Sequence, residues 1–260
     1  MQKIFATLTL LLASWSAMSA DTTRTIDLPT RPGVTQRVLV ITPESAKAVL
    51  VMFTGGNGAL RLSPSGELGM GKGNFLIRTR QQWADKGFVV AMVDAPSDRQ
   101  SEPFLSGYRQ TPEHVTDIKA VIASLRQSTK LPIWLVGTSR GTQSVAFVTA
   151  ALDKSDGPDG LVLTSTILND PKSRSVPAMA LEKITVPTLV VHHQQDACRV
   201  CDSNELPGLM SKLGHASRRE LVTFEGGITQ GDPCEAFAYH GFNGIEPQVV
   251  NRIAGWVLGQ

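Results

Sequence analysis

The chain of 260 residues carries 25 Lys and Arg residues against 23 Asp and Glu residues, and 42% of its residues are hydrophobic. A net charge of +2 excludes the strongly basic surface of a nucleic-acid-binding protein and gives no sign of an anionic membrane as partner. This length and apolar content suit one domain with a full hydrophobic core, and the sequence contains no internal repeat, charge block or long linker.

The first 20 residues have the pattern of a secretory signal peptide. Lys3 precedes an apolar run over residues 4–13, and mostly small residues follow as far as Ala20. The stretch is too short and wrongly flanked for a membrane span, and Ala17-Met-Ser19 fits a cleavage site. We therefore expect an exported protein, periplasmic or secreted, with one mature domain over residues 21–260 and no membrane span. The sequence predicts no particular oligomeric state.

The mature chain alternates between predicted strands and predicted helices. Two β-like runs, over residues 23–28 and 36–41, flank Pro32-Gly33 and predict a hairpin at the edge of a sheet. Further apolar runs predict strands over residues 48–53, 88–93, 133–136, 160–167, 186–192 and 221–224. Helices are predicted over residues 75–87, from Thr111 onward, from Thr142 onward, and over residues 247–258. This order predicts an α/β fold with a mostly parallel, twisted sheet, helices on both faces, and ligands bound beyond the carboxyl ends of the strands.

Residues 137–141 form the pattern Gly-x-Ser-x-Gly at the junction between a predicted strand and a predicted helix. Ser139 is expected at the apex of this turn, where the small residues Gly137 and Gly141 let strand and helix approach closely. This arrangement is typical of a nucleophile elbow. The pattern is short and therefore weakly specific, and the alternative is a Gly-rich turn in which Ser139 caps the following helix.

Acyl transfer by a serine needs a histidine base and an orienting carboxylate. Asp196 follows the strand predicted to end at His192, and His240 ends a polar, Gly-rich loop after the last strand. Both are therefore expected at the same edge of the sheet as Ser139. Reserve acids are Asp170 and, more weakly, Asp202, whereas we expect His193, His114 and Asp117 to serve in packing or support.

With Thr54-Gly-Gly-Asn57 after a buried strand, the order Ser139, Asp196, His240 resembles the α/β-hydrolase superfamily. The resemblance covers nearly all of the mature chain. It implies a carboxylesterase-like serine hydrolase in which Ser139 attacks an acyl carbon, His240 moves the proton and Asp196 orients the imidazole. The implied partner is a small-molecule acyl substrate, without cofactor or metal, and the bond cleaved could be an ester, thioester, lactone or amide.

The resemblance also implies an oxyanion hole built from backbone N–H groups. One donor is expected from Arg140, directly after the nucleophile, and the second from Asn57 or Gly56. The His-Gly pair of many esterases is replaced by Thr54-Gly55 in this chain, which leaves the second donor open.

All three cysteines fall in the two loops that carry the acid and the histidine. In an exported protein a disulfide is expected, so Cys198 or Cys201 should pair with Cys234. We favour Cys198 with Cys234, because both flank residues that must meet in the triad. Such a bond would preorganise the Asp196 and His240 pair and leave Cys201 as an odd thiol.

Three other functions compete with this interpretation. A redox site at Cys198-Arg-Val-Cys201 is disfavoured because the motif comes late in the chain and is accompanied by a third cysteine. A zinc-dependent hydrolase is disfavoured because adjacent histidines on a strand point to opposite faces; its candidate ligands are His192, His193, Asp196, Cys198 and Cys201. A non-catalytic hydrolase-like binding protein would be marked by a missing triad residue, and none is missing.

The segment between the strands predicted to end near residue 167 and to begin near residue 186 is too short for a lid of several helices. We therefore expect a minimal lid and an open cleft, roofed by residues 61–73 and 103–108. Phe104 and Tyr108 would either line this cleft or pack beneath it. Arg61 and Arg140 could favour an acidic substrate. The alternative is that they have no specific role, as is usual for exposed arginines.

Overall fold

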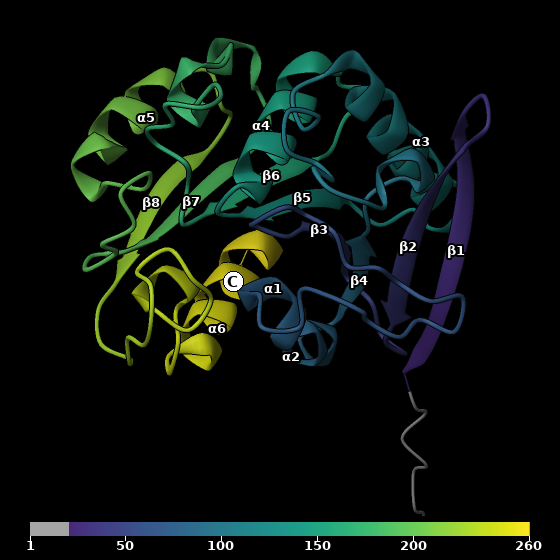
Figure 1. Ribbon diagram of the computed structural model, residues 1–260, viewed down its shortest axis with the longest axis horizontal. Coiled ribbons are helices and arrows are strands. Elements are labelled where there is room, and N and C mark those ends of the chain that lie inside the picture. The colour runs from purple at the N-terminus through teal and green to yellow at the C-terminus, as the bar shows by residue number, and fades with distance from the viewer. Residues whose placement is uncertain (1–20, 260) are drawn as a thin grey trace, which may run out of the picture.

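A single sheet with the strand order β1-β2-β4-β3-β5-β6-β7-β8 lies at the centre of the computed structural model, which describes residues 21–259 (Figure 1). The predicted signal peptide lies outside the described residues. The strands are β1 (Thr22–Arg31), β2 (Val34–Thr42), β3 (Ala48–Phe53), β4 (Phe88–Val93), β5 (Ile133–Thr138), β6 (Gly160–Thr164), β7 (Thr188–His193) and β8 (Arg219–Phe224).

The predicted edge hairpin and the predicted parallel sheet are both confirmed. β1 pairs with β2 and β2 with β4 in antiparallel fashion, whereas every pair from β4 to β8 is parallel. The residues of β3, β4, β5, β6 and β7 are all buried, as their continuous apolar sequences require. Phe53 pairs with Gly137, so the loops after β3 and β5 begin side by side at one edge of the sheet.

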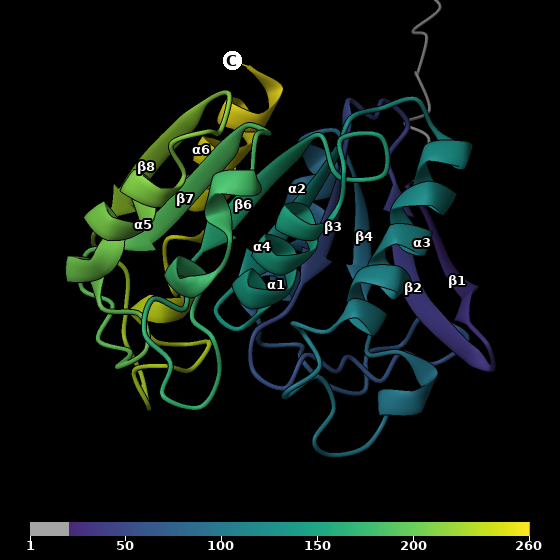
Figure 2. The same ribbon diagram turned by 90° about the horizontal axis from the view of Figure 1, so that it is seen from above.

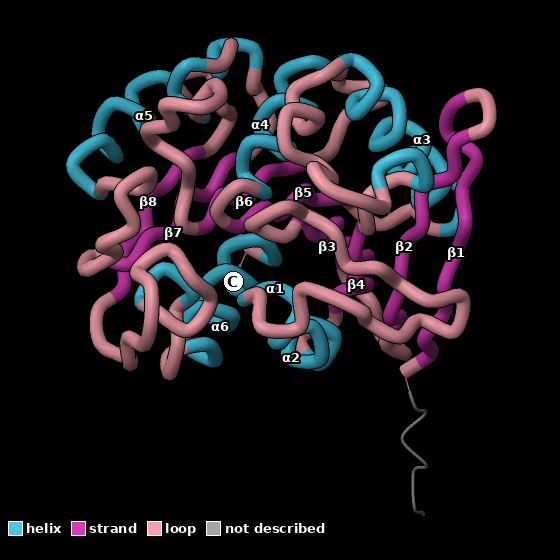
Figure 3. Tube along the Cα trace, in the orientation of Figure 1, coloured by secondary structure: helices cyan, strands magenta, loops and turns pink. Residues whose placement is uncertain are grey.

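Helices cover both faces of the sheet, as the magenta strands between cyan helices show in Figure 3. Figure 1 shows α3 (Pro112–Ser128), α4 (Gly141–Ala151) and α5 (Leu206–Lys212) on one face. The other face is covered by α1 (Phe75–Arg78), α2 (Arg80–Asp85) and α6 (Glu246–Leu258). Each face has its own apolar core, and Figure 2 shows the loops that follow the parallel strands gathered at one edge.

The helix predicted over residues 75–87 is divided in two at Thr79. The Thr79 hydroxyl is buried, donates to the carbonyl of Phe75 at 2.6 Å and accepts from the Trp83 indole at 2.9 Å. A threonine that bonds back to the preceding turn competes with regular helix geometry. The strand predicted over residues 160–167 is also shorter, because Ser165 takes a positive φ of 46° and ends the extended backbone. Helix α5 was not predicted.

The two residues of α3 expected to be structural are both buried. Asp117 accepts hydrogen bonds from Arg31 at 2.8 Å and from the Tyr108 hydroxyl at 2.6 Å, and so ties α3 to the edge hairpin. The ring of His114 packs edge-on against Phe53 and Tyr108. Among residues 21–259, no helix has both the length and the apolar character needed to cross a membrane.

Candidate active site

The turn around Ser139 has the geometry of a nucleophile elbow. β5 ends one residue before Ser139, and α4 begins two residues after it. Ser139 has a positive φ of 51°, a backbone conformation that is costly for any residue other than glycine. A Cβ atom on Gly137 would lie 2.6 Å from the carbonyl carbon of Gly141, and one on Gly141 would lie 2.1 Å from the carbonyl oxygen of Phe53. Both motif glycines are therefore required sterically.

Ser139 does not cap the following helix, which was its alternative role. The N-cap of α4 is Arg140, without a side-chain cap, and Thr142 donates its backbone N–H to the Ser139 carbonyl rather than to the hydroxyl. The strained backbone thus presents a serine hydroxyl at the end of β5 that the helix does not use.

Asp196 and His240 meet across two loops. Nδ1 of His240 lies 2.8 Å from Oδ2 of Asp196, and both side chains are buried. The other carboxylate oxygen, Oδ1, accepts the backbone N–H of Cys198 at 2.9 Å. Ser165 donates its hydroxyl to the His240 carbonyl at 2.6 Å. Nε2 of His240 is buried and has no hydrogen-bond partner among the described residues, the Ser139 hydroxyl included.

Ser139 and His240 line the same cleft, which has a volume of about 440 Å³. The loop after β3 forms another wall of this cleft and contributes Thr54, Gly55, Gly56 and Asn57. It lies directly against the serine, because a Cβ atom on Gly55 would be 2.9 Å from the Cβ atom of Ser139.

The expected oxyanion donors are three backbone N–H groups near Ser139. Within residues 21–259, the N–H groups of Gly56, Asn57 and Arg140 donate to no protein group. The loop is fixed by other bonds: Gly58 donates to the Gly55 carbonyl at 3.1 Å, and the Asn57 side chain accepts from the N–H of Ala59 at 3.1 Å. These free donors beside the serine can meet a negative oxygen.

Arg109 is a buried cation beside the site that sequence reasoning missed. Its Nη2 donates to the carbonyls of Thr54 at 3.1 Å and Gly56 at 3.2 Å, and its Nη1 donates to the Ser144 hydroxyl of α4 at 3.0 Å. Burial, and secondarily the charge of Arg140, lowers the pKa of Arg109 to about 9, so it stays protonated at neutral pH. The side chain therefore holds the loop after β3 against the helix that follows the serine.

The predicted disulfide between Cys198 and Cys234 is confirmed, and the redox Cys-x-x-Cys alternative is wrong because its first cysteine is bonded elsewhere. The bond joins the loop after β7 to the loop after β8, with the two Cα atoms 4.5 Å apart. Cys201 remains a free, buried thiol, and burial raises its pKa well above the usual range.

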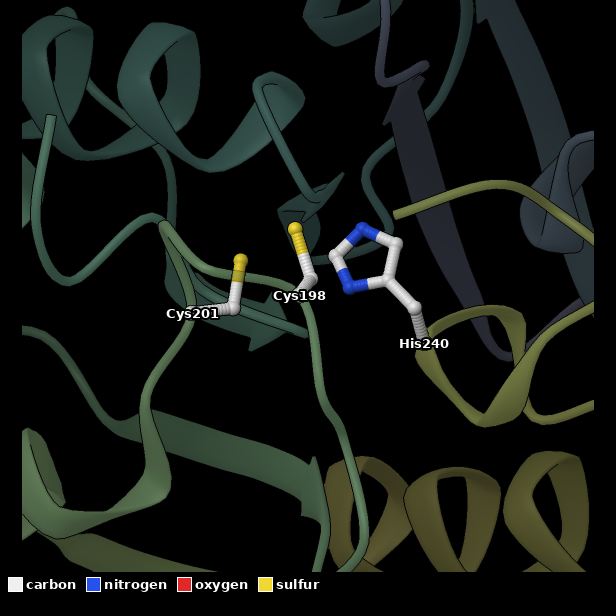
Figure 4. Close-up of side chains that lie close together, drawn as sticks. All are labelled: Cys198, Cys201 and His240. Carbon is white, nitrogen blue, oxygen red and sulfur yellow. The ribbon is translucent and has the colours of Figure 1, made fainter. Parts of the chain in front are cut away.

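Of the five ligands of the zinc alternative, His192 and Asp196 lie close together, with Nε2 of His192 3.6 Å from Oδ2 of Asp196, but the five do not form one cluster. Nε2 of His192 lies 2.9 Å from the Cys201 carbonyl, whereas Nε2 of His193 lies 2.9 Å from the Gly226 carbonyl and its ring stacks on Tyr239. A different group, Cys198, Cys201 and His240, has its sulfur and nitrogen atoms within 4.8 Å of one another (Figure 4). Its Cys198 sulfur belongs to the disulfide and offers no thiolate, so these residues do not fit a zinc ion.

The two reserve acids have other partners. Asp170 accepts from Nη1 of Arg140 at 2.8 Å and from the hydroxyl of Ser173. Although burial opposes it, these bonds hold the pKa of Asp170 well below its usual range. Asp202 accepts the backbone N–H of Asn204 at 3.0 Å in a surface turn. Among the candidate acids, the one bonded to His240 is Asp196.

The roof of the cleft agrees only in part with the sequence prediction. Residues 70–73 of the expected roof line the cleft, together with Asn74 and Phe75, but residues 103–108 do not. Instead, residues 234–237 of the last loop line it, next to Gly73. Phe237 is 49% exposed at this part of the rim. Phe104 and Tyr108 pack beneath the surface with Ala59 and Leu105 and are not lining residues.

Comparisons with solved structures find the same architecture at low sequence identity. The esterase Pf2001 of Pyrococcus furiosus is 12% identical with a TM-score of 0.65, covering 91% of this chain and 92% of that chain. A dienelactone hydrolase from Anabaena variabilis is 12% identical with a TM-score of 0.63, covering 92% and 98%. An alpha-beta serine hydrolase homologue from Coxiella burnetii is 15% identical with a TM-score of 0.58, covering 93% and 98%. The sequence matches no protein-family model and no curated protein.

Proposed function

Since the chain has the α/β-hydrolase fold, we propose that it is a serine hydrolase that cleaves an ester-type acyl bond through Ser139, His240 and Asp196. The observation that carries this proposal is the hydrogen bond of 2.8 Å between His240 and Asp196, in the cleft that a strained serine also lines. It fixes which imidazole nitrogen faces away from the carboxylate.

In the proposed reaction, the hydroxyl oxygen of Ser139 attacks the acyl carbon while Nε2 of His240 takes the hydroxyl proton. The His240 imidazolium then returns this proton to the leaving oxygen, which departs as an alcohol and leaves an acyl-enzyme. Water hydrolyses the acyl-enzyme by the same proton route. Asp196 holds Nδ1 in its protonated form throughout and stabilises the imidazolium.

The negative oxygen of the tetrahedral intermediate is proposed to bind the N–H of Arg140 and one N–H from Gly56 or Asn57. Each such donor contributes about 3 kcal/mol to transition-state stabilisation. Arg109 supports this role, because its bonds to the carbonyls of Thr54 and Gly56 fix the peptide groups of the loop before substrate arrives.

The cleft supports a small substrate, with a volume of about 440 Å³ and an exposed Phe237 at its rim. Two of the structural neighbours are an esterase and a dienelactone hydrolase, and an ester is accordingly the substrate class proposed here. The disulfide is typical of an oxidising compartment, which supports the proposed export to the periplasm or medium.

A fluorophosphonate probe tests the proposal directly, because it reacts with an activated serine. The parent protein should be labelled and Ser139→Ala should not, while Ser155→Ala, an exposed serine in the turn after α4, should be labelled like the parent. A panel of 4-nitrophenyl esters of rising acyl length should be hydrolysed by the parent and not by Ser139→Ala.

The same experiment separates the alternatives. A parent protein that is neither labelled nor active would be the non-catalytic binding protein. Hydrolysis that persists in Ser139→Ala and stops on addition of a chelator would identify a metal-dependent hydrolase. Hydrolysis by the parent that is unaffected by chelator and lost in Ser139→Ala is the expected result.

A further inference from the structure

A second cavity shares no lining residue with the cleft that Ser139 and His240 line. Its volume is about 410 Å³, and it is bounded by the loop before α3, the first turn of α4 and the loop after β6. Its lining includes Arg109, Arg140 and Lys172 together with the side-chain amides of Gln110 and Gln143. The serine mechanism does not use this cavity.

The charged groups that line this cavity are all cationic. Arg140 is partly neutralised by its ion pair with Asp170, whose side chain is fully buried beside it. Lys172 is exposed and, within the part of the chain that the structure describes, makes no ion pair. With three cations against Asp170, the wall of the cavity carries an excess of positive charge.

Arg109 distinguishes this cavity from a patch of surface charge. It is 5% exposed, and its hydrogen bonds go to two backbone carbonyls and one hydroxyl, with no carboxylate among its partners in residues 21–259. A buried charge without a counter-ion is unfavourable, and the charge of Arg140 adds to this cost. An anion bound in the cavity would supply the missing counter-ion of Arg109 and reduce its repulsion with Arg140.

The position of Arg140 relates the cavity to the proposed chemistry. Arg140 is the residue after Ser139, so their Cα atoms are about 3.8 Å apart. Its backbone N–H is a proposed oxyanion donor, while its side chain lines the second cavity. The second cavity is therefore bounded by the residue that directly follows the serine.

We propose that this cavity binds a carboxylate of the substrate, so that the enzyme prefers esters that carry an acidic group. The inference rests on the proposed serine hydrolase function and names the substrate class of the same site. Guanidinium groups bind carboxylates through short, charge-assisted hydrogen bonds. The amides of Gln110 and Gln143 already donate to protein groups, so the cationic side chains are the expected donors to the ligand.

Matched ester pairs test the preference. Mono-4-nitrophenyl glutarate and 4-nitrophenyl pentanoate differ in an acyl carboxylate, and 3-acetoxybenzoate and 3-acetoxybenzamide differ in a carboxylate on the leaving group. The acidic member of at least one pair should have the higher kcat/KM by about tenfold, as one charge-assisted contact of roughly 1.4 kcal/mol gives. The pair that shows the effect identifies which half of the substrate enters the cavity. The ratio should fall as NaCl is added, because salt screens the attraction.

Variants connect the preference to the cavity. Lys172→Met and Arg140→Gln should each lower the acidic-to-neutral ratio of kcat/KM, by about threefold or more. Lys130→Met is the matched control, because Lys130 is exposed and precedes β5 at the opposite edge of the sheet, and it should leave the ratio unchanged. Calorimetry with glutarate on Ser139→Ala gives a readout without catalysis, and Lys172→Met should weaken this binding.

The outcomes separate the two proposals. A protein that is labelled at Ser139 and hydrolyses neutral esters without any acidic preference retains the proposed function and loses the carboxylate site. A preference that responds equally to Lys172→Met and Lys130→Met reflects overall charge and also overturns the site. Glutarate binding without labelling or hydrolysis would retain the site and overturn the hydrolase.

Discussion

The two sides of the cleft keep their shape by different kinds of contact. On the side of the proposed nucleophile, called the nucleophile side below, Ser139 and the loop after β3 are held by short turns, close glycine contacts and the buried Arg109. On the acid–base side, Asp196 and His240 come from loops after β7 and β8, and a disulfide joins these loops. Both pairs of loops follow neighbouring parallel strands, β3 and β5 on the first side and β7 and β8 on the second. The second side differs in having a covalent link, which joins residues 36 positions apart in the sequence.

The largest expected effect tests whether the two sides act as one unit. Ser139→Ala and His240→Ala should each lower kcat by up to about 10⁶-fold, and the double variant should lose no more than either single variant. The reason is that the histidine has no proton to take without the serine. Steady-state kinetics on the three variants checks this, and multiplicative losses would show that the two residues act separately.

Removal of the disulfide should affect the acid–base side most. For the double variant Cys198→Ser, Cys234→Ser we expect a loss of about 4 kcal/mol in the free energy of unfolding, from the freed loop of the unfolded chain. We also expect a lower kcat, because the bond between Asp196 and His240 is no longer braced.

Denaturant unfolding and ester hydrolysis measure the two effects, with Cys201→Ser as the control that keeps the disulfide. Both cysteines are removed together because Cys201 could otherwise form a new disulfide with whichever of the two remained. Full activity in the double variant would show that the loops keep their arrangement without the link.

A methyl group placed in the elbow should damage the nucleophile side alone. Gly141→Ala puts a Cβ atom 2.1 Å from the carbonyl oxygen of Phe53, and the strand and helix must move apart. We expect a loss of about 3 kcal/mol in unfolding free energy and loss of probe labelling at Ser139. Gly208→Ala, where no atom lies within 4 Å, is the control and should be neutral or slightly stabilising. Equal stability of the two variants would contradict the steric requirement.

The smallest effect concerns pH and again the nucleophile side, because His114 packs against Phe53 at the end of β3. Burial, and then the charge of Arg109, lowers the pKa of His114 from 6.5 to about 3. Between these values the unfolded chain binds a proton that the folded chain does not, so stability should fall as pH decreases below 6.5. At pH 5 the loss is about 2 kcal/mol.

Denaturant titrations from pH 7 to pH 5 measure this loss. His114→Phe removes the titrating group from the same buried volume and should flatten the pH dependence. An unchanged slope in this variant would assign the acid sensitivity to other groups.

The sequence alone predicted those features of the site that depend on residues close together in the chain or on the order of strands and helices. The strand, turn and helix around Ser139 are continuous in sequence, from Ile133 to Ala151, and alternation of apolar runs predicted the sheet that brings Asp196 and His240 to the same edge. Cys234 was predictable as one partner of the disulfide because it is the only cysteine in the second loop, whereas Cys198 was favoured over Cys201 for its place beside Asp196.

The features that the sequence did not predict depend on packing between segments that are distant in the chain. Arg109 lies in a loop without periodicity, and only the folded chain shows that it is buried between residues 54–56 and α4. The rim at residues 234–237 is a loop that no strand pattern places. The break at Thr79 depends on a hydroxyl that bonds both Phe75 and Trp83, which a single apolar stripe does not reveal.

The buried thiol of Cys201 has a consequence for how the correct cysteine pairing persists. Thiol–disulfide exchange needs a thiolate, and burial keeps this thiol protonated beside the Cys198 sulfur. In the folded chain, we therefore expect exchange to a Cys198–Cys201 bond to be slow. In the unfolded chain the same thiol would ionise at its ordinary pKa and could attack the disulfide, so we expect alkaline unfolding to scramble the pairing. The native fold thus acts as kinetic protection for the bond that stabilises it.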